Sequence, residues 1–312
     1  MELLSSIFTL STAQTAMELG CIYALVALAL FLSFSILNIA DLSTDGCFTL
    51  GCAVCCQVTL LGHPILGLLA AMLAGVLSGY ITAFLQTKLG VASILAGIIV
   101  NTGLYTVNLA VMGFSSTLSV FKCDTIFSMA KAALEPVMGS WYKFFVAAAI
   151  VLVMGGLLTW FLKTRLGLSI RATGDSPDMI KASSVNPSFT ITVGLCISGS
   201  FTALSGAVLA QYQKSCDINL GTGMVTIALA SLIIGETLVG KGGMFRRVLG
   251  AIIGSCLYRL FVAVALRLNV PAECMKLVSA LIVAIAIASP TMKRFIAFQK
   301  QKIQRRKEGA SC

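Results

Sequence analysis

The sequence is 312 residues long, with 58% hydrophobic and 11% charged residues and a mean hydropathy of +0.96. A typical soluble domain carries about 25% charged residues, so this chain could not cover a water-facing surface. The composition excludes an ordinary soluble protein and predicts an all-α bundle of transmembrane helices, since a helix satisfies its own backbone hydrogen bonds in lipid. The net charge of +10 does not indicate nucleic-acid binding, because the basic residues lie between apolar runs and at the C-terminus.

Roughly 20 residues cross a bilayer as a helix, so the length allows about eight to ten spans. Nine apolar segments can be counted, in chain order Ala16 to Leu37, Phe48 to Leu61, Ile65 to Leu85, Val91 to Gly113, Phe144 to Leu162, Phe189 to Ala210, Met224 to Val239, Val248 to Leu266, and Leu277 to Ala288. The second, seventh and ninth are short, which predicts tilted, broken or buried helices. We expect one membrane domain over residues 1–290 and a basic tail over residues 291–312.

Small residues recur at the spacing that lets helices approach closely in lipid. Gly75 and Gly79 form one such pair, and Gly250 and Gly254 form another. These pairs predict a tightly packed bundle.

Three clusters of lysine and arginine indicate the orientation, because these residues concentrate in cytoplasmic loops. One cluster surrounds loop 164–187, one follows the seventh segment, and one crowds the C-terminal tail. Two segments separate each cluster from the next, so all three can lie on one side. We therefore expect a multi-pass plasma-membrane protein with loop 164–187 and the C-terminus in the cytoplasm and loop 114–142 outside.

Loop 164–187 contains the start signal of a short helix. Ser176 resembles an N-cap and Pro177 occupies the first helical turn, followed by Asp178. The helix would carry Met179 and Ala182. A short helix between two spans could dock a soluble partner, although an ordinary solvated loop would have a similar composition.

Ionisable side chains inside a membrane are costly and by default mark function or a buried pair. Glu18, Glu236 and Arg259 lie within apolar segments. For Glu236, the sequence leaves open a local ion pair with Lys241 or Arg246 and a role in transport. Arg259 lies roughly 16 Å into its segment at 1.5 Å per residue, and Glu18 lies at a similar depth. Either these two side chains form an ion pair, or Arg259 faces a cavity and binds a substrate carboxylate.

Two polar stripes provide further pathway candidates. Asn101, Tyr105 and Asn108 recur at helical spacing and therefore share one face of the fourth segment. Asp45, Thr49 and Cys52 form a similar stripe at the start of the second segment. Each stripe must turn away from lipid, so it lines either a helix interface or a wet path.

The sequence lacks the motifs of a catalytic or ATP-binding chain. There is no GxxxxGK[ST] loop, no HExxH and no GxSxG. Cys52 and Cys55 form a CxxC, but no second pair or histidine cluster follows, so we predict no metal site.

Loop 164–187 resembles the coupling loop of the branched-chain amino acid and simple sugar ABC permease family. The resemblance rests on Thr164-Arg165-Leu166-Gly167, Ile170-Arg171-Ala172 and Gly174-Asp175 in the loop, Tyr23 to Leu28 and Asp41-Leu42-Ser43 before it, and Ile234-Gly235-Glu236, Tyr258-Arg259-Leu260 and Ser289-Pro290 after it. The stretch Asp41 to Gly46 and the pair Gly235-Glu236 look closest to the tryptophan/tyrosine-type subgroup. Two positions depart from the pattern: Ser184 stands where the loop usually has glycine, and Cys274 where the subgroup commonly has an acid.

The resemblance implies a transport subunit rather than an enzyme, in an importer for a small solute such as an aromatic or branched-chain amino acid. It implies no cofactor in this chain, since ATP and Mg²⁺ would bind a separate ATPase. Seven loop residues would contact that ATPase: Arg171, Gly174, Asp175, Pro177, Asp178, Met179 and Ala182. The expected partners are cytoplasmic ATPase subunits, an extracellular substrate-binding protein, a second permease copy and lipid, with no nucleic acid.

An ion-coupled secondary transporter is the main alternative. Such proteins usually have inverted repeats and acidic residues near the membrane midplane. The sequence contains no clear internal repeat and few buried acids, so we favour the ATP-driven permease.

Overall fold

The computed structural model describes residues 10–131, 139–182, 185–240 and 242–267, together with positions 277, 280, 281, 284 and 288. Its elements are α2 (Leu10–Leu30), the π-helix η1 (Phe31–Ile36), α3 (Thr44–Leu60), α4 (Pro64–Thr87), α5 (Ser93–Val111), β1 (Thr117–Ser119), the 3-10 helix η2 (Gly139–Trp141), α7 (Tyr142–Phe161), α8 (Arg165–Asp175), α9 (Pro177–Ala182), α10 (Pro187–Gln213), β2 (Ser215–Asp217), α11 (Met224–Val239) and α12 (Met244–Arg267). The predicted all-α bundle is confirmed. The two three-residue strands, which pair antiparallel, were not predicted.

The first eight predicted segments form helices. Six helices in the described ranges are long and apolar enough to cross a membrane, and α3 and α11 are shorter apolar helices of 17 and 16 residues. They correspond to the second and seventh segments, which were predicted to be short. The ninth segment is described only at isolated positions, and the predicted basic tail, Ser184 and Cys274 lie outside the described residues.

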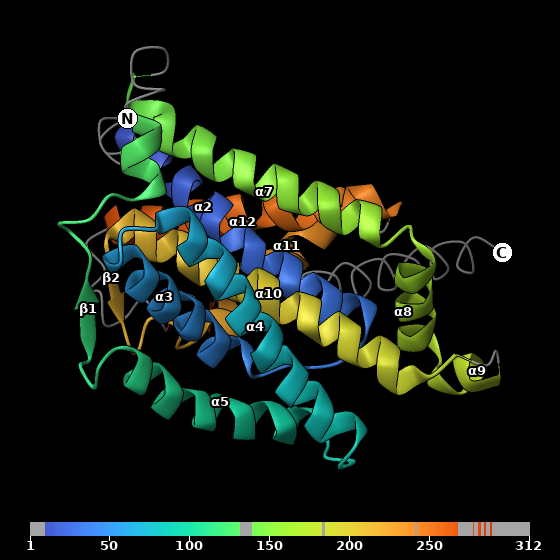
Figure 1. The fold of residues 1–312 in the computed structure, drawn as a ribbon. Helices are drawn as coiled ribbons and strands as arrows, with labels where there is room; N and C mark the ends of the chain where they lie inside the picture. The colour runs from blue at the N-terminus through green and yellow to red at the C-terminus, as the bar shows by residue number, and fades with distance from the viewer. Residues whose placement is uncertain are drawn as a thin grey trace, which may run out of the picture.

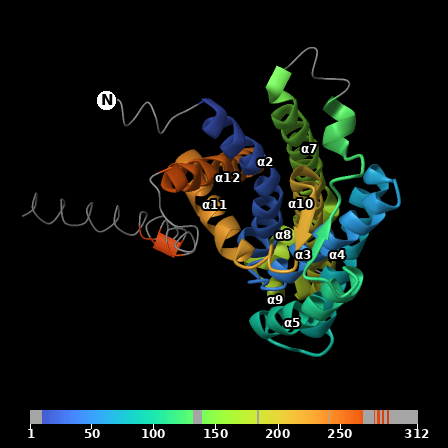
Figure 2. The ribbon, with the colours of Figure 1, turned by 90° about the vertical axis from the view of Figure 1, so that its left-hand side faces the viewer.

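Helices α2 and α10 form the centre of the bundle. Both bury side chains along nearly their whole length, and α10 packs against α4 and α3. Helices α11 and α12 lie on one side of α2, and α4 and α5 lie on the other (Figure 2). The outer helices expose large apolar side chains such as Leu73, Leu152 and Trp160. An apolar outer surface of this kind suits hydrocarbon rather than water.

Small residues let these helices pack at close range, as predicted. Gly75 of α4 lies against the backbone of Gly199 in α10, and Gly254 of α12 lies against Ser231 and Gly235 in α11. A Cβ atom at Gly75 or Gly254 would overlap the facing backbone. The predicted glycine pairs therefore form two of the bundle's tight interfaces.

The two ends of the bundle differ. Strands β1 and β2 lie at one end, and α8 and α9 lie at the other (Figure 1). Helix α2 runs between these ends, since Thr12 contacts Arg267 at one end and Ile36 contacts Gly174 near the other. The described parts of loops 114–142 and 164–187 thus lie at opposite ends, as the orientation prediction requires.

Candidate solute pathway and coupling element

The two predicted polar stripes line one pocket. This pocket, here called the pathway pocket, has a volume of about 290 Å³ and lies between α3, α5 and the segment before α11. Five of the six predicted side chains from the two stripes contribute to its wall: Asp45, Thr49, Asn101, Tyr105 and Asn108. The sixth, Cys52, is fully buried in a core cluster with Ala210 and Cys216 and does not line the pocket. The sequence analysis missed the opposite wall, which is formed by Ile218, Asn219, Gly221 and Thr222.

Asp45 holds the start of α11 against the start of α3. Its carboxylate accepts hydrogen bonds from the backbone N–H groups of Gly223 and Val225, both at 2.9 Å. Thr49 accepts a further bond from the N–H of Gly221 at 3.1 Å. The N–H groups at a helix start have no partner within the helix, so the Asp45 carboxylate satisfies donors that would otherwise be orphaned. Asp45 therefore shapes the pocket, and each of its carboxylate oxygens accepts one backbone hydrogen bond.

Asn108 has one unused hydrogen-bonding atom. Its side chain is only 1% exposed, and Nδ2 donates to the carbonyl of Gly46 at 3.0 Å. Within the described residues, Oδ1 has no partner although it is buried. Helices α3 and α5 approach closely at Gly46, where a Cβ atom would lie 2.7 Å from Oδ1 of Asn101 and 3.0 Å from Cβ of Leu104. A buried acceptor without a donor is costly unless a ligand or water supplies one.

Tyr105 and the rim of the pocket are more open. Tyr105 is 52% exposed, and Thr102, Asn219 and Thr222 are also exposed. The lining residues in the described part of the chain include neither lysine nor arginine. These residues offer neutral hydrogen-bonding groups, the Tyr105 ring and the Asp45 carboxylate, which already accepts two backbone hydrogen bonds.

At the other end, the predicted short helix is present as α9. It begins at Pro177 as predicted and carries an exposed ion pair between Asp178 and Lys181 at 3.2 Å. Pro177, Met179 and Ala182 all lie in this helix. Arg171 and Asp175 are exposed on the preceding helix.

That preceding helix, α8, was interpreted as loop from the sequence. Thr164 caps it by accepting a hydrogen bond from the N–H of Gly167, a signal that could have been found. Thr173 bonds Thr190 of α10 at 2.8 Å, and Gly174 lies so close to η1 that a Cβ would overlap the carbonyl oxygen of Ile36. Helix α8 is thereby fixed to the bundle, and α9 projects beyond it (Figure 1).

A charged network also lies where η1 meets α11 and α12. Glu236 forms an ion pair with Arg247 at 3.0 Å, and the Ser35 hydroxyl donates to Glu236 while accepting from Arg247. The sequence left open a local ion pair of Glu236 with Lys241 or Arg246. The pairing with Arg246 is wrong: Arg247 points toward η1, whereas Arg246 is exposed. Lys241 lies outside the described residues.

The predicted ion pair between Glu18 and Arg259 is not formed between these two described residues. Glu18 accepts hydrogen bonds from Gln14 at 2.9 Å and from the Tyr212 hydroxyl at 2.8 Å. The Arg259 guanidinium lies over the Tyr23 ring, 3.5 Å from its centroid. The similar depth of the two residues was a poor guide, because depth does not fix which way each side chain turns about its helix.

Residues 13–287 match the family model described as "Branched-chain amino acid transport system / permease component". The chain belongs to this permease family. Its relatives include the tyrosine transport system permease protein of Clostridioides difficile, 30% identical over 94% of this chain and 98% of that protein. The D-allose transport system permease protein AlsC of Escherichia coli is 28% identical over 80% of this chain and 72% of that protein. No solved structure matches the chain significantly.

Membership of the permease family defines the chain as a multi-pass membrane transport subunit rather than an enzyme. It also favours the ATP-driven permease over the ion-coupled alternative. The relatives named for tyrosine and for D-allose differ in solute, so the family alone does not fix the substrate. Among the described residues, no cluster of His, Cys, Asp and Glu could hold a metal ion.

Proposed function

We propose that this permease forms the membrane pathway of an ATP-driven importer for a small solute, with an amino acid as the preferred class. The observation that carries the proposal is the unit formed by α8 and α9. It combines exposed charged residues with a rigid attachment to η1 and α10. A motor that pushes on α9 would therefore move the bundle rather than a loose loop.

In this proposal, a cytoplasmic ATPase binds the surface that carries Arg171, Asp175 and Asp178. ATP and Mg²⁺ bind that partner. Two permease copies form the complete pathway, and an extracellular substrate-binding protein delivers solute near loop 114–142. The clusters of lysine and arginine near α8 and α12 favour a cytoplasmic position for this end and for the C-terminus.

The pathway pocket supports an amino-acid-sized solute. A volume of about 290 Å³ is at the small end of the roughly 300–1,000 Å³ typical of ligand pockets. The free Oδ1 of Asn108 could accept a hydrogen bond from an amine or hydroxyl, and the exposed Tyr105 ring could stack on an aromatic side chain. The relative named for tyrosine transport supports an aromatic substrate. Uptake assays with tyrosine, leucine and D-allose would compare the three solute classes.

The coupling assignment can be tested by co-expressing the permease with a candidate ATPase partner. We expect Asp175→Lys and Met179→Asp to reduce the co-purified ATPase at least tenfold. Asp124→Lys is the matched control, because Asp124 is also exposed but lies in loop 114–142 at the opposite end of the bundle. If both α8–α9 variants retain the ATPase as well as the control does, the coupling assignment is wrong.

A further inference from the structure

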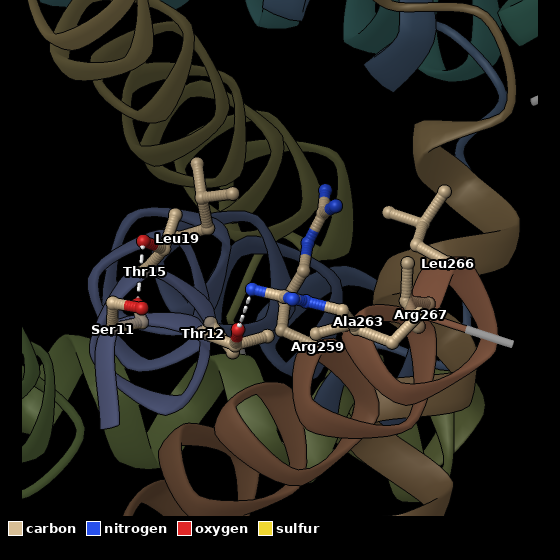
Figure 3. A pocket seen from close by; sticks show the side chains of 10 residues that line it. Ser11, Thr12, Thr15, Leu19, Arg259, Ala263, Leu266 and Arg267 are labelled. Carbon is tan, nitrogen blue, oxygen red and sulfur yellow. Dashed lines mark hydrogen bonds between the residues drawn. The ribbon is translucent and has the colours of Figure 1, made fainter. Parts of the chain in front are cut away.

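A second cavity, here called the α2–α12 groove, lies at the end of the bundle opposite α8. Its volume is about 420 Å³. Its wall combines three hydroxyl side chains from α2 with two arginines from α12: Ser11, Thr12, Thr15, Arg259 and Arg267. Among the described residues, those that line the groove include no carboxylate (Figure 3). The groove is therefore electropositive.

Arg259 is the unusual residue of this groove. Its guanidinium stacks on Tyr23, which in turn stacks on Phe48 with ring centroids 6.1 Å apart. Its Nε is buried and has no hydrogen-bond partner within the described residues. No described carboxylate forms an ion pair with it, and Glu18 is directed toward Gln14 and Tyr212 instead.

An arginine inside a membrane bundle normally has a counter-ion, because an unpaired charge there is costly. Cation–π stacking compensates only part of that cost. Arg267 is different: it is exposed, and its guanidinium donates to the Thr12 hydroxyl at 2.6 Å. Figure 3 shows the two side chains pointing in different directions, so Arg267 does not relieve Arg259.

We propose that the α2–α12 groove binds an oxyanion, a carboxylate or a phosphate, at Arg259. The planar guanidinium presents parallel donors that match the two oxygens of such a group. The Tyr23 ring holds this fork in place before the ligand arrives, so little side-chain entropy is lost on binding. Two sources are possible for the same chemistry: the carboxylate of a transported solute, or the phosphate of an anionic lipid headgroup.

The test uses the full-length permease in nanodiscs, with solutes that differ in the carboxylate and with lipids that both carry a phosphate but differ in net headgroup charge. L-Tyrosine and L-leucine are compared with tyramine and 3-methylbutylamine, which lack the carboxylate. Phosphatidylglycerol is compared with phosphatidylcholine by counting retained lipids in native mass spectrometry. Arg259→Gln removes the charge, Arg259→Lys retains it without the planar fork, and Arg246→Gln is a control at the other end of the same helix.

A solute carboxylate predicts that an amino acid binds about tenfold more tightly than its amine in wild type, with the preference lost in Arg259→Gln. If the ligand is a lipid phosphate, the amino acid and its amine should bind equally. Wild type should then retain a phosphatidylglycerol molecule that Arg259→Gln loses. In either case Arg259→Lys should be intermediate and Arg246→Gln unchanged. If Arg259→Gln does not fold, the ligand preference of wild type and its reduction in Arg259→Lys still test the proposal. The proposal fails if wild type shows neither preference, or if Arg259→Lys and Arg259→Gln, where each folds, bind as wild type does.

Four glutamates lie outside the described residues, and their carboxylates are tested by Glu→Gln substitution at Glu2, Glu135, Glu273 and Glu308. The proposal predicts that all four variants keep the wild-type ligand preference. A gain of anion binding in any of them would mean that the chain supplies its own counter-ion, which would overturn the proposal. The solute arm rests on the proposed transport function, and uptake by wild type measures that function separately. Absence of wild-type uptake counts against transport, whereas uptake without any anion preference counts only against the groove.

Discussion

Asp45 in the pathway pocket and Arg259 in the α2–α12 groove differ in the hydrogen-bond partners that the described residues provide. In the pocket, each oxygen of the Asp45 carboxylate accepts a hydrogen bond from a backbone N–H at the start of α11. In the groove, the Arg259 guanidinium has a ring on one face and a buried Nε without a partner in the described residues. A charge that is hydrogen-bonded to the backbone holds the fold together, whereas an unpaired one is available for a ligand. The location of a charge in the bundle therefore does not reveal its role; its partners do.

The largest effect is expected from Asp45→Ala. The substitution leaves the N–H groups of Gly223 and Val225 unpaired, so the stability should fall by about 3 kcal/mol. Asp45→Asn keeps one acceptor oxygen and should cost about half as much. Thermal unfolding in detergent measures both. Equal stability of Asp45→Ala and wild type would remove the contrast between the pocket and the groove.

Arg259→Met should change the stability far less than Asp45→Ala does. Replacing an unpaired charge by an apolar side chain of similar length should change the stability by no more than about 1 kcal/mol in ligand-free detergent. The same unfolding assay applies. A loss as large as that of Asp45→Ala would mean that Arg259 has a structural partner.

Asn108→Leu tests the unused acceptor in the pathway pocket. It removes the bond from Nδ2 to Gly46, so a stability loss of about 1 kcal/mol is expected. Solute uptake should fall much further, at least tenfold, because the free Oδ1 is lost as well. Asn108→Asp retains an oxygen at this position and should recover part of the uptake of an amine-bearing solute. Normal uptake by Asn108→Leu would assign Asn108 to packing alone.

The smallest effect is expected from Tyr105→Phe. The ring remains and only the hydroxyl is lost, so uptake of an aromatic amino acid should change by less than about threefold, or 0.6 kcal/mol. Tyr105→Ala should reduce uptake of tyrosine more than uptake of leucine. A uniform reduction for both solutes would argue against stacking.

The sequence predicted the helices better than their contacts. Helical spacing correctly placed Asn101, Tyr105 and Asn108 on one face, and the serine–proline signal correctly predicted α9. Helix α8 was missed because only a few of its residues, including Ile170 and Thr173, are buried, so its polar composition resembled a loop. The wall formed by Ile218 to Thr222 was also missed. Gly221 of this wall donates a hydrogen bond to Thr49 across 172 residues of chain, and no local sequence pattern predicts a contact at that separation.

The sequence also could not predict which residue partners each buried charge. Hydropathy and the rise per residue gave a depth for Arg259, but the direction of its side chain depends on how α12 packs against α2. The pairing of Glu236 with Arg247 rather than Arg246 reflects the same limit, since adjacent residues on a helix point about 100° apart.

The central claim is that ATP hydrolysis by a partner drives this permease through α8 and α9. Solute uptake into proteoliposomes that contain the permease, its ATPase and its binding protein tests this most directly. We predict uptake that requires internal ATP, persists when ionophores dissipate the proton and sodium gradients, and is lost in Asp175→Lys. Uptake by the permease alone that collapses with the ion gradient would contradict the account and favour an ion-coupled transporter.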